Sequence, residues 1–168
     1  MNKVKINSNI TVIIPFYNGR DFIKKALESL ANEITKADQI IIINDGSTRN
    51  NDVLFLKRLI YEFPIPIKLV NKKNGGQSEA RNLGAKLAKT KFISFLDQDD
   101  MVYPIKNKVL KKSLEEEIIK DPLCCYVYGD VTRINKNDTI LEDRISSTRE
   151  LKLKNKEDSF KFETKKYI

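Results

Sequence analysis

The sequence has 168 residues, a formal net charge of +8, and no histidine or tryptophan. This length suits one domain with a proper hydrophobic core, and no apolar run approaches the roughly 20 residues that a membrane-spanning helix needs. The absence of histidine excludes Ser-His-Asp catalysis, Cys-His catalysis and every His-ligated metal site, so any metal must be bound by oxygen ligands.

The start of the chain and its cysteines favour a reduced, cytoplasmic protein. The first five residues lack the apolar region of a signal peptide. Cys124 and Cys125 are adjacent in an apolar run, where a bridge between strand neighbours would be strained, so both are predicted to be buried and unpaired. Lysines spread along the chain favour solvated faces over a nucleic-acid site. Residues 152–156 could contact the cytoplasmic membrane face peripherally, although a solvated tail is favoured.

The first half of the chain repeats a strand-then-helix pattern. Residues 10–14 are an unbroken β-branched run, which predicts a strand covered on both faces. A turn with Pro and Gly follows, and Asp21 is the predicted N-cap of a helix whose apolar residues recur at helical spacing. Residues 39–43 predict a second strand and residues 52–61 a second helix.

The middle of the chain continues this pattern. Residues 67–70 predict a third strand, and a loop follows in which Gly75 and Gly76 permit positive φ and close approach of a ligand. The next helix is predicted to pack closely on the sheet because small and apolar residues share one of its faces. That face carries Ala80, Leu83, Gly84, Leu87 and Ala88.

Three further elements complete the regular part of the chain. Residues 92–96 predict a fourth strand, and Pro104 is the predicted first residue of a helix that ends near residue 120. Residues 126–128, with the two cysteines before them, predict a fifth strand.

The alternation of strands and helices predicts an α/β fold with a mostly parallel sheet and right-handed crossovers. Residues 131–134 and 139–141 predict a short hairpin, whereas residues 150–168 are too charged for an element to be assigned. In such sheets, ligands bind beyond the carboxyl ends of the strands. The loops expected at that edge are residues 15–17, 44–47, 71–76 and 97–100.

The fourth strand runs directly into three carboxylates, Asp97, Asp99 and Asp100. Two unit charges about 4 Å apart repel by roughly 4 kcal/mol at an effective dielectric of about 20, so a positive partner is expected. Mg²⁺ or Mn²⁺ fits, because these ions prefer oxygen ligands and usually combine one or two carboxylates with substrate phosphates. Alone, so short a motif does not distinguish a cation site from an acidic polar loop.

Common nucleotide-binding fingerprints are absent. The turn after the first strand lacks Gly-x-Gly-x-x-Gly, the chain contains no P-loop, and the acidic pair of a receiver domain is replaced by Pro15 and Phe16. A carboxylate at Asp45, an arginine at Arg81 and the acidic cluster remain. Asp45 can accept from a base or a sugar hydroxyl and Arg81 can pair with a phosphate, a combination that suits a nucleoside diphosphate carrying a leaving group.

The chain contains, in order, TVIIPFYN (residues 11–18), INDGS (43–47), NGGQSEARNLG (74–84) and FLDQDD (95–100). Together these motifs resemble those of the family 2 glycosyltransferases, which have the GT-A fold. The resemblance covers roughly residues 10–130. It implies a single GT-A-type nucleotide-sugar binding domain over residues 1–168, apparently truncated at the C-terminus so that the acceptor-binding part is missing.

By this resemblance, the residues that bind the nucleotide sugar are Pro15, Phe16, Tyr17, Asp45, Gly76, Arg81, Asp97 and Gln98. Residues 15–17 would line the base pocket, and Asp45 would accept a hydrogen bond from the base ring. Asp97 would bind the ribose side of the donor, and Arg81 would lie near the phosphates or the base. Two alternatives stay open: Asp45 could cap its own Gly-Ser turn, and Arg81 could be a surface helix residue.

The resemblance also implies an Mn²⁺ or Mg²⁺ cofactor and a UDP-type donor. Asp99 would bind the cation that bridges the diphosphate, with Asp97 and Asp100 as further candidate ligands and Gln98 close by. As the anomeric carbon becomes oxocarbenium-like, the departing diphosphate gathers negative charge, which a cation stabilises. The implied reaction moves a sugar, with inversion, to a glycan or lipid-linked acceptor of the cell envelope.

The general base is the element that the sequence does not supply. An inverting enzyme needs a carboxylate to deprotonate the acceptor hydroxyl, and family members carry it well downstream of the Asp-x-Asp motif. Glu142, Asp143, Glu157 and Asp158 are available, but none has a convincing context. A non-catalytic nucleotide-sugar binding module or an inactive fragment is therefore the alternative to an active glycosyltransferase.

Overall fold

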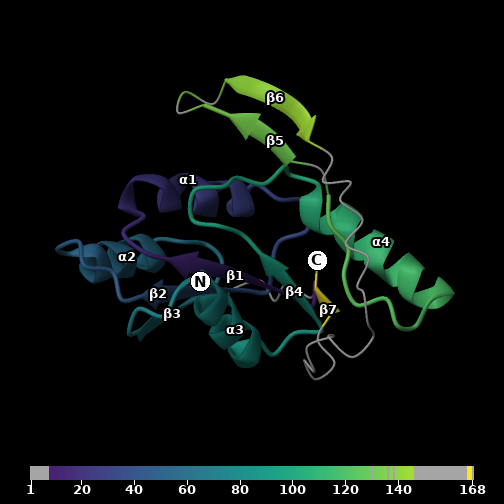
Figure 1. The fold of residues 1–168 in the computed structure, drawn as a ribbon, viewed down its shortest axis with the longest axis horizontal. Helices are drawn as coiled ribbons and strands as arrows, with labels where there is room; N and C mark the ends of the chain where they lie inside the picture. The colour runs from purple at the N-terminus through teal and green to yellow at the C-terminus, as the bar shows by residue number, and fades with distance from the viewer. Residues whose placement is uncertain (1–7, 130, 136, 138, 146–165, 168) are drawn as a thin grey trace.

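The computed structural model describes residues 8–129, 131–135, 137, 139–145 and 166–167. Its centre is a parallel five-stranded sheet with the order β3-β2-β1-β4-β7, which confirms the predicted α/β fold with a mostly parallel sheet (Figure 1). These strands are β1 (Ile10–Phe16), β2 (Gln39–Asp45), β3 (Ile67–Lys72), β4 (Phe92–Phe95) and β7 (Lys166–Tyr167).

Among the described residues, four helices connect and cover these strands, and they confirm the predicted alternation. They are α1 (Arg20–Ala31), α2 (Asp52–Tyr61), α3 (Gln77–Leu87) and α4 (Lys106–Lys120). Helices α1 and α3 lie on opposite sides of the sheet (Figure 1). Within the described part of the chain, none of the helices combines the length and the apolar character that crossing a membrane requires.

The core has two layers because the inner strands β1 and β2 are buried on both faces. Every residue of β1 is buried, and side chains alternate between the faces. Ile10, Val12 and Ile14 pack in the layer that α1, α2 and α4 cover, whereas Ile13 packs in the layer that α3 covers. A Cβ on Gly84 would lie 2.4 Å from Ile13 Cγ2, so the small residue lets α3 approach the sheet, as predicted.

Two predicted helix starts were wrong. Helix α1 begins at Arg20 with Gly19 as N-cap, so Asp21 lies inside the first turn, where a negative charge still favours the positive end of the helix dipole. Helix α4 begins at Lys106 rather than at Pro104. The Pro104 carbonyl instead accepts a hydrogen bond from the backbone N–H of Ile34, 2.7 Å away, so Pro104 belongs to the loop before the helix.

The predicted fifth strand is absent from the described residues: only Tyr126 in the segment 126–128 forms an isolated bridge. Tyr126 and Tyr128 are exposed and their rings stack on each other, whereas the half-buried Val127 between them packs against the core. The prediction that both cysteines are buried was also wrong, because Cys124 is half-buried and Cys125 is exposed, although neither forms a disulfide.

The predicted hairpin is confirmed. Strands β5 (Val131–Ile134) and β6 (Ile140–Ile145) pair antiparallel and lie apart from the main sheet (Figure 1). Of the charged segment 150–168, only residues 166–167 lie within the described part of the chain, where they form β7 beside β4.

Candidate functional site

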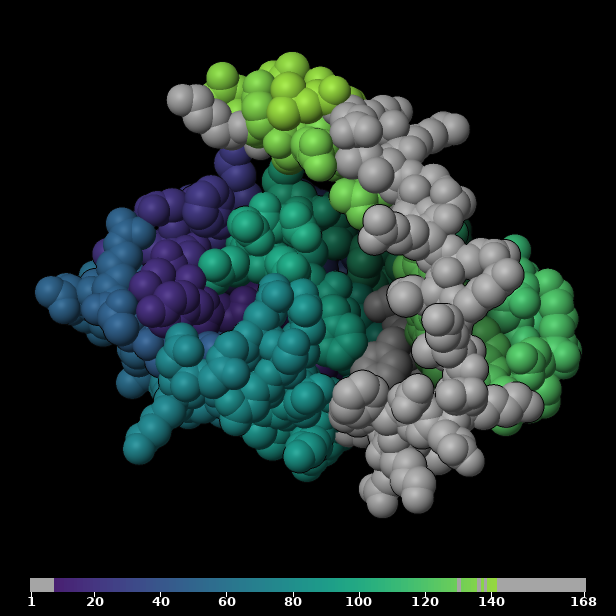
Figure 2. Space-filling view, viewed as in Figure 1, coloured from purple at the N-terminus to yellow at the C-terminus, as the bar shows by residue number. Residues whose placement is uncertain are grey.

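A cleft of ≈ 360 Å³ lies at the carboxyl ends of the central strands. All four loops expected at this edge contribute to the cleft or border it, and Figure 2 shows the purple surface of the β1–α1 segment bordered by teal surface of later residues. The lining consists of Pro15, Phe16, Tyr17, Asp45, Asn74, Gly76, Gln77, Asp97, Gln98 and Asp99. Eight predicted site residues are thus brought together, whereas Arg81 and Asp100 are outside the lining.

The wall from β1 combines core residues with one exposed ring. Pro15 and Phe16 are buried, and Phe16 packs in the core layer beneath α1. Tyr17, the first residue after β1, is 43% exposed. Tyr17 therefore offers more side-chain surface to a ligand than the two residues before it.

Asp45, at the end of β2, is buried and holds the loop between β3 and α3. Its Oδ1 accepts hydrogen bonds from Gly75 N, 3.0 Å away, and from Lys72 Nζ, 2.5 Å away, and its Oδ2 accepts from Gly76 N, 2.8 Å away. Burial raises the pKa of the Asp45 carboxyl, but Lys72 and the two N–H groups outweigh this effect and hold the pKa below its ordinary value.

The turn after β2 is capped by a neighbour of Asp45. Asn44 Oδ1 accepts a hydrogen bond from the backbone N–H of Ser47, 3.1 Å away. The alternative in which Asp45 caps its own Gly-Ser turn is therefore wrong. Gly46 has φ +69°, and a Cβ there would lie 2.6 Å from Asn74 N, so this turn needs glycine for its conformation and for its packing against the next loop.

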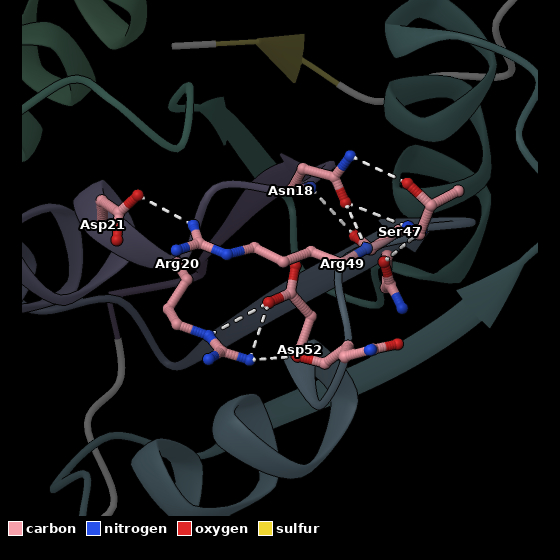
Figure 3. Close-up of polar contacts among 9 residues, drawn as sticks. Asn18, Arg20, Asp21, Ser47, Arg49 and Asp52 are labelled. Carbon is pink, nitrogen blue, oxygen red and sulfur yellow. Dashed lines mark hydrogen bonds and ion pairs between the residues drawn. The ribbon is translucent and has the colours of Figure 1, made fainter.

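A polar network joins the β1–α1 segment to the β2–α2 loop beside the cleft (Figure 3). Asn18 donates from its backbone N–H to Ser47 Oγ, and its Oδ1 accepts from the backbone N–H of Thr48 and of Arg49. Arg20 forms an ion pair with the buried Asp52 at 3.0 Å, and Arg49 pairs with the exposed Asp21 at 2.8 Å. These contacts of Asn18 were not predicted, although its place just after a strand was the available signal.

The acidic loop presents its three carboxylates differently. Asp97 Oδ1 lies 2.5 Å from Arg81 Nη2, so the alternative in which Arg81 is only a surface helix residue is wrong. Asp99 is exposed and lines the cleft. Although Asp100 is exposed as a residue, partial burial of its carboxyl group and the charges of Asp99 and Asp97 raise its pKa, against the effect of Arg81.

The carboxylates do not form a closed metal cage. Within the described ranges, no group of three or more His, Cys, Asp or Glu side chains is arranged to hold a metal ion by itself. This agrees with the ordinary Mg²⁺ pattern, in which one or two carboxylates act together with substrate phosphates and water.

Gln98 lies between Asp97 and Asp99 in the chain but turns towards β1. Its Oε1 accepts a hydrogen bond from the backbone N–H of Tyr17, 2.9 Å away, and its Nε2 donates to the Tyr17 carbonyl, 3.1 Å away. The acidic loop and the β1 wall of the cleft are therefore joined by a pair of hydrogen bonds.

A buried polar cluster beside the start of α4 was not predicted. Lys106, the first residue of α4, donates from Nζ to Ser94 Oγ, 2.6 Å away, and to Asn107 Oδ1, 3.2 Å away. Glu33 is 1% exposed and burial raises its pKa to about 7, although Lys106, Asn107 and Lys36 oppose the shift. Nothing in the sequence signals this cluster, because its members come from three separate segments.

Residues 11–166 match the model of a protein family described as glycosyl transferase family 2. YibD of Escherichia coli, called an uncharacterized glycosyltransferase, is 39% identical over 112 residues, which cover 66% of this chain and 32% of that protein. The minor teichoic acid biosynthesis protein GgaB of Bacillus subtilis is 36% identical over 104 residues, which cover 61% of this chain and 11% of that protein. The chain therefore spans about a third or less of the length of these relatives.

Solved glycosyltransferases share the fold. Residues 1–349 of Staphylococcus aureus TarS in complex with UDP-GlcNAc match with a TM-score of 0.55 and 26% identity, over 64% of this chain and 31% of that one. The mannosyltransferase PcManGT from Pyrobaculum calidifontis, in complex with GDP-Man and Mn²⁺, matches with a TM-score of 0.51 and 21% identity, over 55% of this chain and 28% of that one. The sheet and its helices thus have the predicted GT-A fold.

Proposed function

Because the chain belongs to glycosyl transferase family 2, we propose that its cleft binds a nucleoside-diphosphate sugar, with UDP as the nucleotide, together with a divalent cation. One observation carries this proposal: a single cleft of ≈ 360 Å³ is lined by Asp45 and the β1 wall on one side and by Asp97 and Asp99 on the other. The match to a TarS structure that contains UDP-GlcNAc supports UDP over other nucleotides.

At one end of the cleft, the base would lie against residues 15–17. Asp45 would accept from the base ring, since Oδ2 already accepts from Gly76 N but retains a second lone pair, whereas Oδ1 already accepts two hydrogen bonds. Gly76 has φ +91°, and no heavy atom lies within 4 Å of an added Cβ, so its backbone can approach a ligand closely.

At the other end, Asp99 would bind Mn²⁺ or Mg²⁺, with Asp97 or Asp100 as a further ligand. The oxygen donors suit a hard cation. Partial burial, and after it the charges of Asp99 and Asp97, raise the pKa of Asp100, and a bound cation would oppose both effects. When bound, the cation would stabilise the negative charge of the departing diphosphate. Arg81 would keep Asp97 oriented through their ion pair, and would add positive charge close to the phosphates.

We propose transfer of the sugar to a glycan or lipid-linked acceptor as the activity of the whole protein. The GgaB match, to a protein of minor teichoic acid biosynthesis, supports an acceptor in the cell envelope. Inversion would require a general base, and this proposal assigns none. The side chains of Glu142 and Asp143 in β6, and the segment with Glu157 and Asp158, lie outside the described residues.

The proposal treats residues 1–168 as a single domain with its motifs in residues 10–130, in the cytoplasm or at the cytoplasmic face of a membrane. A second candidate is a donor-binding module without turnover. One observation favours this candidate: two of the carboxylates that line the cleft are already paired, Asp45 with Lys72 and Asp97 with Arg81. Neither is free to act as a general base without losing its partner.

Calorimetric titration with UDP, in the presence and absence of Mn²⁺, tests the proposal directly. We expect binding that tightens with the cation, and binding indifferent to Mn²⁺ would contradict the cation site. Hydrolysis of UDP-sugars in the same samples separates the two candidates, because only a catalytically competent domain releases UDP from a donor at a rate above the background.

A further inference from the structure

The side-chain amide of Gln98 takes the place of a missing strand neighbour at the end of β1. The pairing of β1 with β4 ends where Ile13 lies opposite Phe95, and the Ile13 carbonyl accepts from the backbone N–H of Leu96 at 3.1 Å. In a strand, the backbone N–H and C=O groups of alternate residues point to the same side. Those of Tyr17 therefore point in the same direction as those of Ile13, which face β4. There the N–H and C=O of Tyr17 both bond to the Gln98 amide.

The packing around Gly19 holds this amide in position. A Cβ on Gly19 would lie 2.2 Å from Gln98 Oε1 and 2.8 Å from Nε2, so the amide rests directly against the Gly19 backbone. Gly19 has φ −97° and ψ 24°, a conformation that alanine also adopts, so the close contact and not the backbone requires glycine here.

We propose that Gln98 is a positioning residue that fixes the Pro15–Tyr17 wall of the cleft against the acidic loop, so that the two ends of the donor site keep one geometry. This inference rests on the proposed function, and it gives Gln98 a role other than direct contact with the donor. Both polar atoms of the amide are already bonded to Tyr17, and each bond spans 81 residues of sequence. The acidic loop and the β1 wall are thereby made interdependent.

A double-mutant cycle on the intact chain tests this role. Gln98→Ala removes the amide, and Gly19→Ala displaces it without altering a residue that lines the cleft. If Gly19 acts only through the amide, Gly19→Ala has a large effect in the unaltered protein and little effect in the Gln98→Ala background. Gly129→Ala is the matched control, because the nearest heavy atom to its added Cβ is 3.7 Å away.

Amide hydrogen exchange of Tyr17 is a readout that needs no ligand. We expect faster exchange of the Tyr17 N–H in both single variants, with no change at Ile13 in the core of β1. Equal exchange at Tyr17 in all proteins would overturn the proposal, whatever the protein binds.

The affinity for UDP with saturating Mn²⁺ is the second readout. Each single variant should bind about tenfold more weakly, the scale of losing two neutral hydrogen bonds, and the double variant should bind no more weakly than Gln98→Ala. Additive losses, or no loss in Gly19→Ala, would overturn the positioning role. Failure of the unaltered protein to bind UDP would instead contradict the proposed function, and hydrogen exchange would then decide on the Gln98 contact.

Discussion

The carboxylates at the two ends of the cleft differ in where their hydrogen-bond and ion-pair partners come from. At the base end, Asp45 is 4% exposed and accepts from Lys72, Gly75 and Gly76, so the protein itself supplies its partners. At the cation end, Asp99 and Asp100 are exposed, and the pKa of Asp100 is raised by partial burial and by its acidic neighbours.

The carboxylate at the base end therefore has its partners in the protein, whereas those at the cation end depend on a ligand for theirs. The base end is organised before a donor arrives, whereas the cation end has an excess of negative charge that Arg81 offsets in part. Substitutions at the two ends should therefore differ in their dependence on metal. Gln98, which bonds to the base wall from within the acidic loop, lies where the two halves meet.

The largest effect is expected at the cation end. Asp99→Ala should weaken UDP binding in Mn²⁺ by at least about 100-fold, above the range usual for outer-shell partners of a metal, because it removes the proposed ligand itself. Binding of UDP without metal should be nearly unchanged. Calorimetry under both conditions measures this, with the exposed Asp121→Ala at the end of α4 as control. Equal losses with and without Mn²⁺ would show that Asp99 does not act through a cation.

At the base end, the loss should be independent of metal. Asp45→Asn leaves Lys72 without its buried partner and one N–H of the loop without a full acceptor. The affinity for uridine and UDP should therefore fall about tenfold, and the free energy of unfolding should fall by roughly 2–3 kcal/mol. Uridine titrations and urea denaturation check both effects. Glu79→Gln is the matched control, since it removes the more exposed partner of Lys72 and should cost under about 1 kcal/mol.

Neutralising the buried Glu33 should change the stability of the fold in the opposite direction from Asp45→Asn. The pKa of Glu33 is raised from 4.5 to about 7 by burial, so its stabilising protonated form is complete below pH 4.5 and is lost as the pH rises through 7. Glu33→Gln should therefore be more stable than the unaltered protein at pH 8, by roughly 2–3 kcal/mol beyond any difference at pH 4.5.

Urea denaturation of Glu33→Gln at several pH values measures that difference. The exposed Glu28→Gln in α1 is the control, and its stability should follow the unaltered protein at every pH. Parallel profiles for Glu33→Gln and the unaltered protein would mean that Glu33 titrates normally and that Lys106 compensates its burial.

Much of this architecture was predictable because buried strands and helix faces require apolar residues at a regular spacing in the sequence. The β-branched runs of β1 and β2 and the helical spacing of apolar residues marked the alternating elements, and the predicted helix 52–61 agrees with α2 at both ends. The segment 126–128 failed because β-propensity measures the fit to a neighbouring strand, and its two tyrosines are exposed and stack on each other.

The location of the site could be predicted from the sequence, whereas most of its side-chain contacts could not. A parallel sheet brings the ends of its strands to one edge, which located Asp45, Asp97 and Asp99 together. Their partners were not predictable, since the pairing of Asp45 with Lys72 depends on the register of β2 and β3, and the bonds of Gln98 depend on where β4 stops. The residue types at strand ends predict what kind of ligand a site can bind. The strand register decides which of those side chains already have a partner within the protein.

The smallest effects are expected at the rim beside the base end, where two arginines test whether burial governs the polar network. Arg20→Ala leaves Asp52 with a side chain that is 0% exposed, so unfolding should cost about 1–2 kcal/mol less. Arg49→Ala breaks a pair whose side chains are 44% and 64% exposed, and should cost under about 0.5 kcal/mol. Urea denaturation ranks the two variants. Equal losses would contradict the idea that burial governs this network, because the charges of an exposed pair are screened by salt whereas those of a buried pair are screened much less.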